Sequence, residues 1–186
     1  MSSAFDIKSH DQLAAMAFPI RTEIVEIVSN LGPLSIGDLS RLMDKKRPLL
    51  HFHVSKLLAV GLLLGAGERG DGRSRELLYR TPAGPLYVVY DRNDPINVEM
   101  TARYSRNILA RAERQITKSF LLGSAVTDGK NRDTHATQMT AWLSNPELAK
   151  LNQLVEELRD LMKPSQEIKG KQLLSLTIGL APLDPK

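Results

Sequence analysis

Residues 45–65, KKRPLLHFHVSKLLAVGLLLG, decide the fold of this chain because they predict an amphipathic helix with a cationic start. Proline fits only the first turn of a helix, so Pro48 places the start at residues 45–47. The apolar residues of one helical face follow at i, i+4, i+7 and i+8, namely Leu50, Val54, Leu57 and Leu58. Gly61 ends the helix, which we therefore expect to span about residues 46–60.

The same stretch holds two histidines, and their spacing decides whether they form a metal or catalytic pair. Residues i and i+2 of a helix point about 200° apart, so His51 and His53 cannot bind one metal ion together. His53 adjoins the apolar face, and we expect it to be packed or hydrogen-bonded. His51 faces outward with Ser55, either to contact a partner molecule or as a merely exposed side chain.

Three helices are expected before this stretch, and each start is marked by a capping residue or a proline. Ser9 has the spacing of a capping box, so a helix is expected to follow it. Pro19 begins a second helix, which the Gly-Pro pair at 32–33 ends. Ser35 and Asp38 repeat the capping signal before a short third helix.

A turn and a hairpin complete the pattern on either side of the quoted stretch. Asp44 precedes the helix and is a residue type that tolerates the left-handed conformation. Two extended runs, at 62–68 and 75–80, are joined by RGDGRS, whose glycines supply hairpin turn chemistry. Helix, short turn, helix and hairpin in this order are typical of a helix-turn-helix with a wing.

The basic residues of the chain gather in the same region. Between residues 41 and 80, nine basic and four acidic side chains leave a surplus of five positive charges, which exceeds the +4 of the whole chain. The basic residues are Arg41, Lys45, Lys46, Arg47, Lys56, Arg69, Arg73, Arg75 and Arg80. A local cationic excess indicates a polyanionic partner, and the alternative is a solvated surface that happens to be basic.

Four segments resemble, in order, those of the ArsR-type winged-helix transcription regulators. The segments are MAFPIRTEIVEIV, PLSIGDLSRLM, LLHFHVSKLLAVGLL and GRSRELLYR, which lie within residues 10–82. The chain departs from that family at Asp44-Lys45-Lys46, where a glycine, an apolar residue and a serine are usual, and at His51, where serine is frequent. The resemblance implies a winged-helix domain over residues 1–92 that binds double-stranded DNA and regulates transcription, more commonly by repression.

Helix geometry and this resemblance together indicate the residues that would contact DNA. Side chains at the N-terminal end of a recognition helix reach base edges, and lysines suit phosphates. Arginines of the wing, over residues 68–76, suit the backbone or the adjacent minor groove. The base-facing candidates are Arg47, His51 and Ser55, flanked by Phe52 and Lys56; Lys45 and Lys46 are phosphate candidates; and the wing contributes Arg69, Arg73 and Arg75.

Residues 93–186 are expected to form a second domain for dimerisation or effector sensing. Residues 95–122 have no internal Gly or Pro and an apolar residue at every fourth position, so they predict one long helix whose stripe needs a partner surface. We expect a homodimer built partly from this helix, because paired half-sites match two-fold proteins; packing within the chain is the alternative. Farther on, the patterns predict a strand at 133–143, a helix at 146–162 and a strand at 171–182.

The tail also resembles the carboxy-terminal extension of some ArsR-like regulators, through Trp142-Leu143, Pro146-Glu147 and Leu180-Ala181-Pro182. That likeness favours an interaction domain of mixed α and β structure. The whole chain is therefore expected to be mainly α with a small β content, an α+β fold in which a winged helix-turn-helix domain precedes a helical or mixed C-terminal domain.

Composition limits the remaining function classes. The chain has no cysteine, which excludes disulfides, thiolate metal sites and a cysteine nucleophile. It has neither a signal-peptide pattern nor an apolar run long enough to span a bilayer, so we expect a cytoplasmic protein without membrane contact. Phosphate-loop, nucleophile-elbow and metalloprotease motifs are absent from the sequence, so we expect no enzyme activity, metal or cofactor. A small organic effector stays open, as does a winged-helix scaffold that contacts only proteins.

Overall fold

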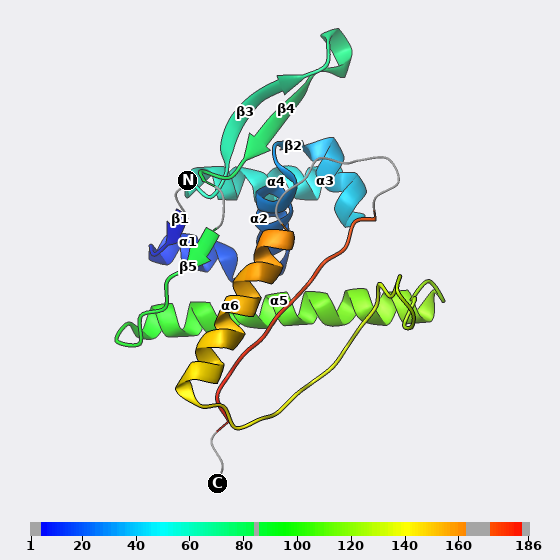
Figure 1. The fold of residues 1–186 in the computed structure, drawn as a ribbon. Coiled ribbons are helices and arrows are strands. Elements are labelled where there is room, and N and C mark those ends of the chain that lie inside the picture. The colour runs from blue at the N-terminus through cyan, green and yellow to red at the C-terminus, as the bar shows by residue number, and fades with distance from the viewer. Residues whose placement is uncertain (1–4, 84–85, 163–171, 184–186) are drawn as a thin grey trace.

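The computed structural model describes residues 5–83, 86–162 and 172–183 and has a mixed α+β fold, as the sequence predicts (Figure 1). The first four helices are α1 (His10–Met16), α2 (Pro19–Leu31), α3 (Ile36–Met43) and α4 (Arg47–Ala59). Ser9 caps α1, and Pro19 opens α2 at a position where a helix needs no N–H donor. The predicted order of these helices is confirmed.

The connection between α3 and α4 is specified at both ends by local chemistry. Ser35 Oγ accepts a hydrogen bond from the Asp38 N–H at 3.1 Å, and the Asp38 carboxylate accepts one from the Ser35 N–H at 3.0 Å, so the predicted capping box is present. Asp44 ends α3 in the left-handed conformation, with φ 52° and ψ 50°. The chain reverses there, and α4 begins with Pro48 in its first turn.

Two small sheets accompany the helices. β2 (Leu34–Ser35), β3 (Leu64–Arg69) and β4 (Glu76–Arg80) form an antiparallel sheet of order β2-β4-β3, and β3 with β4 is the expected hairpin. Figure 1 shows the hairpin projecting from the helical body. β1 (Phe5–Ile7) pairs in parallel with β5 (Leu86–Val88), which the sequence analysis did not predict.

The hydrophobic core lies among the first four helices and under the base of the hairpin. Its most deeply buried large side chains are Ile7, Leu13, Met16, Ile24, Leu39, Leu50, Leu57, Leu62 and Leu63. Burying one such side chain stabilises the fold by about 1.5–3 kcal/mol. Leu62 and Leu63 directly follow the turn at Gly61, so the chain is anchored in the core before the hairpin begins.

α5 (Pro95–Leu121) is the predicted long helix, and its first half packs on α1 and α2. Tyr104 donates a hydrogen bond to Glu26 of α2 at 2.8 Å. Arg111 forms an ion pair with Glu23 of α2 at 3.5 Å. After Arg111 the helix continues without a buried residue, and Figure 1 shows it running on past α2.

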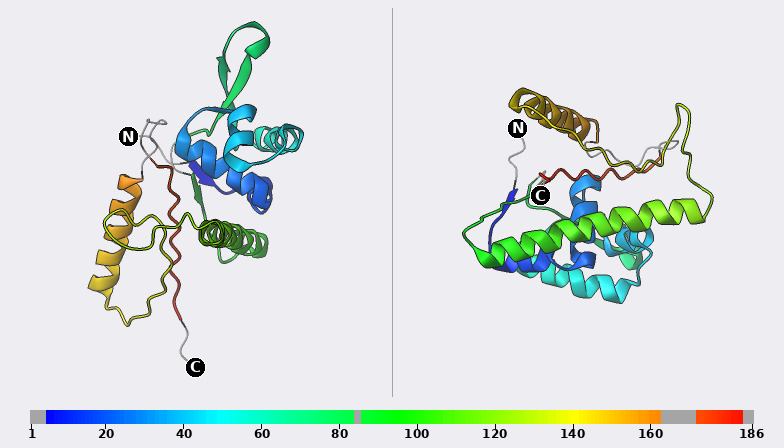
Figure 2. Two further views of the ribbon diagram at one scale, coloured as in Figure 1. Left: turned by 90° about the vertical axis from the view of Figure 1, so that its right-hand side faces the viewer. Right: turned by 90° about the horizontal axis from the view of Figure 1, so that it is seen from below.

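α6 (Asn145–Leu161) lies where a helix is predicted. Ser144 and Glu147 form its capping box, which repeats the chemistry that begins α3. None of its residues is buried. Figure 2 shows α6 in a layer apart from α5, connected to it by a long extended segment. None of the helices that the structure describes is both long and apolar enough to cross a membrane.

The prediction of two strands in the C-terminal part is wrong. Residues 133–143 have no regular structure. The same is true of residues 172–182, and Lys171, the first residue of the second predicted strand, lies outside the described residues. Alternation of apolar residues favours a strand, but a strand forms only beside a hydrogen-bonding neighbour, and no described strand pairs with either segment.

Candidate nucleic-acid interface

α4 has one buried side and one exposed side. Leu50, Val54 and Leu57 are at most 2% exposed and fix the helix to the core. The predicted contact residues of the helix and of the turn before it are all exposed, namely Lys45, Lys46, Arg47, His51, Phe52, Ser55 and Lys56. The structure therefore leaves each of these seven side chains accessible to a partner.

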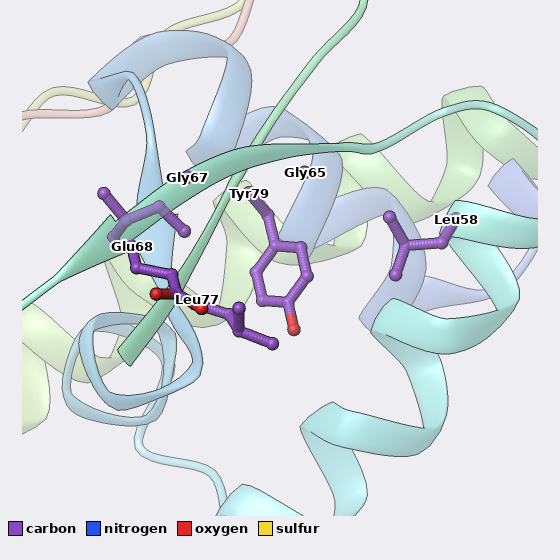
Figure 3. Close-up of a pocket in the computed structure, with 7 residues that line it drawn as sticks. Leu58, Gly65, Gly67, Glu68, Leu77 and Tyr79 are labelled. Carbon is purple, nitrogen blue, oxygen red and sulfur yellow. The ribbon is translucent and has the colours of Figure 1, made fainter. Parts of the chain in front are cut away.

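The apolar face of α4 is narrower than the sequence predicts. Leu58, which we expected on that face, is 37% exposed and lines a hollow beside the hairpin. Successive helical residues are 100° apart. Leu57 therefore lies near the centre of the apolar face, and Leu58 lies at its edge. Figure 3 shows Leu58 across this hollow from Tyr79 of β4.

The two histidines of α4 lie in different surroundings. His53 is 9% exposed, and its ring meets that of Phe52 edge-on at a centroid distance of 5.2 Å. Burial lowers the pKa of His53, and the nearby charge of Arg21 lowers it further, so this ring is neutral at pH 7. His51 is exposed and lines a hollow together with Arg47. His53 is thus a packed side chain, as predicted.

Two neighbouring hollows lie between α4 and the hairpin, and both are lined by Leu77 and Tyr79 of β4. The larger has a volume of about 500 Å³ and a mainly apolar lining that includes Leu58 (Figure 3). The smaller has a volume of about 250 Å³. Its charged lining residues are Arg47, Arg75 and Glu76, and His51 also lines it. The hairpin therefore stands beside α4 and adds a second charged edge to the exposed surface.

An ion-pair network fastens the hairpin to α3. Arg69 Nη2 lies 2.8 Å from Asp38 Oδ2 and 3.1 Å from Glu76 Oε2. Ser35 Oγ lies 3.0 Å from the same Asp38 oxygen and 2.9 Å from the same Glu76 oxygen, so its single proton serves one carboxylate at a time. Ser35 and Asp38 are buried, and the network therefore joins the start of α3, in the core, to the exposed hairpin.

Hydrogen bonds keep this network charged. Burial by itself would raise the pKa of Asp38, but hydrogen bonds from the backbone and side chain of Ser35 and from Arg69 outweigh it, and the pKa is lowered. Hydrogen bonds from Ser35 and Arg69 also lower the pKa of Glu76. The bonds to Glu76 and Asp38 raise the pKa of Arg69. All three groups are ionised at pH 7, and Arg69 acts as a structural cation.

The predicted wing arginines differ in their surroundings. Arg69 is held by the network, and Arg75 of the hairpin forms an ion pair with Glu68 on the neighbouring strand. Arg73 lies in the 3₁₀ turn Gly72–Ser74 at the hairpin tip, and its side chain lies outside the part that the structure describes. A phosphate that contacted Arg69 or Arg75 would therefore share the guanidinium with a carboxylate.

Sequence reasoning missed the acidic partners of these arginines, Asp38, Glu68 and Glu76. Their pairing depends on strand register and on how the hairpin meets α3, and neither can be read from the spacing of charges. Leu77 and Tyr79 could have been found, because alternate residues of a strand share a face. Among the described residues, no three His, Asp or Glu side chains gather so that they could hold a metal ion.

No protein-family model matches this chain, and no curated protein sequence matches it.

Proposed function

We propose that the protein is a sequence-specific DNA-binding transcriptional regulator with a winged helix-turn-helix domain over residues 1–92. The observation that carries the proposal is the exposed, cationic side of α4, whose opposite side is held in the core. An α-helix fits the major groove of B-DNA, and a helix fixed along one side leaves the other free to enter it. Lys45 and Lys46, in the turn before the helix, suit phosphate oxygens.

The exposed residues of α4 have chemistries that suit a groove. Arg47, at the helix start, can donate two hydrogen bonds to guanine, and His51 lies one turn farther on. Ser55 can bond to a base or a phosphate once its hydroxyl leaves the Phe52 carbonyl, to which it donates at 2.8 Å. The ring of Phe52 suits thymine methyl groups. Lys56, whose ammonium lies 5.7 Å from that ring, adds a flanking positive charge.

The hairpin would supply the second contact, on the DNA backbone or in the adjacent minor groove. Its cations are Arg69, Arg73 and Arg75. The side chains of Arg69 and Arg75 are 53% and 65% exposed although both are ion-paired, so a phosphate can approach either guanidinium from solvent. Arg73 belongs to the turn at the hairpin tip, the part of a wing that would reach the DNA backbone first.

We further propose that the protein acts as a homodimer through residues 93–186 and represses transcription when bound. The second half of α5 has no buried residue and is available to a second copy. A two-fold protein would match paired half-sites on DNA. A small organic molecule is the class of effector that this second domain would sense.

Fluorescence anisotropy with DNA fragments from around the protein's own gene tests the proposal. We expect a preference for one fragment over random duplex and a steep loss of affinity with salt, because phosphate contacts release counterions. Arg47→Ala should cost about 1–3 kcal/mol on the preferred fragment and relax specificity, whereas Lys46→Ala should weaken binding to all duplexes alike and reduce the salt slope by about 1.

Lys130→Ala, in the exposed segment between α5 and α6, is the matched control and should leave both affinity and specificity unchanged. The absence of any preferred fragment at any salt concentration would refute the proposed function. Equal, sequence-independent losses from Arg47→Ala and Lys46→Ala would refute the base-reading role of Arg47 alone.

A winged-helix module that binds only proteins is the second candidate. It is favoured by the exposure of Leu49 and Phe52, at 39% and 54%, and by the apolar hollow under Leu58. Such a module would bind a protein partner through Phe52 and show no affinity for duplex DNA in the same titration. Phe52→Ala would then abolish the protein complex, while Lys46→Ala would leave it intact.

A further inference from the structure

The accessible surface of this chain is too large for one folded body on its own. It measures 13761 Å², whereas a compact monomer of 20.7 kDa exposes about 8,900 Å². Each subunit of an obligate homodimer buries about 1,000–2,500 Å², which is half of the interface total, so the excess of about 4,900 Å² is about twice the upper figure. A second molecule of this chain can therefore cover up to about half of the excess.

The uncovered apolar side chains gather in the C-terminal third. Of the large apolar side chains that the structure describes, all those that are more than 80% exposed lie after residue 120. They are Leu121, Met139, Trp142 and Leu161. The surface that lacks a partner therefore belongs to the end of α5, to α6 and to the segment between them.

α6 carries a seam that suits another helix. Its apolar residues alternate at spacings of three and four, which is the pattern of a coiled-coil seam. They are Leu148, Leu151, Val155 and Leu158, with Met162 directly after the helix. No residue of α6 is buried, and Leu151 and Val155 are half-buried, so the described part of its own chain covers this seam only in part. An amphipathic helix in this situation needs an apolar partner.

The second half of α5 offers a matching surface. Its apolar residues Ala112, Ile116 and Phe120 advance by four, and Phe120 is 51% exposed. Only Asn97, near the other end, is buried in α5. Figures 1 and 2 show α6 of the same chain crossing α5 in a separate layer. Within one chain, α6 therefore does not run along the second half of α5.

Between two copies of the chain, the charges favour a contact of α6 with α5 over a contact of α6 with α6. α5 carries five basic and two acidic side chains, whereas α6 carries four acidic and two basic ones. Arg114 and Lys118 belong to the second half of α5, and Glu156 and Glu157 to the second half of α6. Opposite charges beside an apolar seam decide which helices pair, and two acidic α6 helices would repel each other.

The connection between the two helices is long enough for exchange. Residues 122–144 lie between the end of α5 and the start of α6, and a fully extended chain of that length spans at most about 80 Å. α5, with 27 residues, is about 40 Å long. We propose that α6 of each protomer docks on the second half of α5 of a second copy, so that two chains exchange their α6 helices. This proposal rests on the homodimer of the proposed function and is independent of DNA binding.

Charge reversal in two complementary chains tests the exchange. One chain carries Arg114→Glu and Lys118→Glu, and the other carries Glu156→Lys and Glu157→Lys. In either homodimer, the contacting helices then have like charge, and sedimentation should detect association at least about tenfold weaker than that of the natural chain. In an equimolar mixture, every α6 meets an oppositely charged α5, and a heterodimer of wild-type strength should form.

Arg92→Glu with Lys130→Glu is the matched control, since it makes the same charge change outside both helices and should leave association unchanged. The inference is overturned if the mixture of folded variants does not associate, or if the natural chain sediments as a monomer. It is also overturned if one chain with all four reversals associates normally while the mixture does not, because α6 then pairs within its own chain.

Cysteine cross-linking decides the matter if a reversed variant loses its helical circular dichroism. The natural chain has no cysteine, so Phe120→Cys in one tagged chain and Leu158→Cys in a differently tagged chain provide the reactive thiols. A cross-linked product that carries both tags supports the exchange, and failure to form one contradicts it. A dimer that exchanges α6 but binds no DNA would refute the proposed function alone, and a DNA-binding dimer without exchange would refute this inference alone.

Discussion

Replacing Ser35 with alanine should loosen both α3 and the hairpin, because one hydroxyl serves both. Ser35 Oγ accepts the Asp38 N–H at 3.1 Å and donates to the carboxylate of Asp38 or of Glu76. The residue is 1% exposed, so water cannot take over these bonds. Loss of an N-cap costs about 1 kcal/mol, and loss of a buried hydroxyl donor costs about 1 kcal/mol more. We therefore expect Ser35→Ala to lower the free energy of unfolding by about 2 kcal/mol.

Thermal unfolding followed by circular dichroism measures this effect. A loss of about 2 kcal/mol should lower the Tm by about 4–8 °C in a chain of this length. Ser105→Ala is the matched control, because the Ser105 hydroxyl is exposed and donates only to a carbonyl of its own helix, that of Thr101 at 3.0 Å. Its effect should stay within about 0.5 kcal/mol.

Hydrogen exchange locates the loss within the fold. In Ser35→Ala, amide exchange should rise in residues 34–43 and in the hairpin, residues 64–80, and should stay unchanged in α5. Equal Tm values for Ser35→Ala and Ser105→Ala, or faster exchange spread evenly over the chain, would refute the claim that this network fastens the hairpin to α3.

Acid should weaken the same attachment, because the pKa values of Asp38 and Glu76 lie below their usual 3.8 and 4.5 in the folded protein. The two carboxylates contribute fully to the free energy of unfolding above about pH 5, and this contribution is lost as the pH falls through their lowered pKa values. Urea titrations should therefore give a lower stability at pH 3 than at pH 6. Equal stabilities at the two pH values would contradict this. Leu57→Ala should lower the free energy of unfolding by about 2–5 kcal/mol, because Leu57 is fully buried, and Leu58→Ala should lower it by less than about 1 kcal/mol. Equal losses in the same titration would show that the buried side of α4 is wrongly assigned. Gly37→Ala should push the Glu76 carboxylate out of the network, since the added Cβ would overlap Glu76 Oε1, and amide exchange in the hairpin should rise; unchanged exchange would contradict the close approach.

The N-terminal fold can be predicted from the sequence because its signals are local. Ser9, Ser35 and the prolines at 19 and 48 mark helix starts through chemistry that acts within one turn. Asp44 supplies the left-handed residue on which the turn depends. The candidate contact residues of α4 follow from the same reasoning, because a helix with three fixed apolar residues has a determined outer side.

The remaining features depend on contacts between distant residues. β1 and β5 are short strands about 80 residues apart in the sequence, and each forms a strand only by pairing with the other. The apolar alternation of residues 133–143 favours a strand, but no described strand lies beside them to pair with. The partners of Arg69 depend on how the hairpin meets α3, so the sequence shows a cationic wing where the structure shows a cation held between two carboxylates.

Dimethyl sulfate footprinting of the DNA around the protein's own gene tests most directly the central claim, that the exposed side of α4 enters the major groove, because the reagent methylates guanine N7 in that groove. A homodimer of this kind should protect two half-sites whose centres lie about 10 base pairs, or a multiple of that, apart. The protection should disappear in Arg47→Ala at concentrations where Lys130→Ala still protects. Uniform cleavage along every fragment at saturating protein, or a footprint that survives the combined replacement of Arg47, His51 and Ser55, would contradict the account.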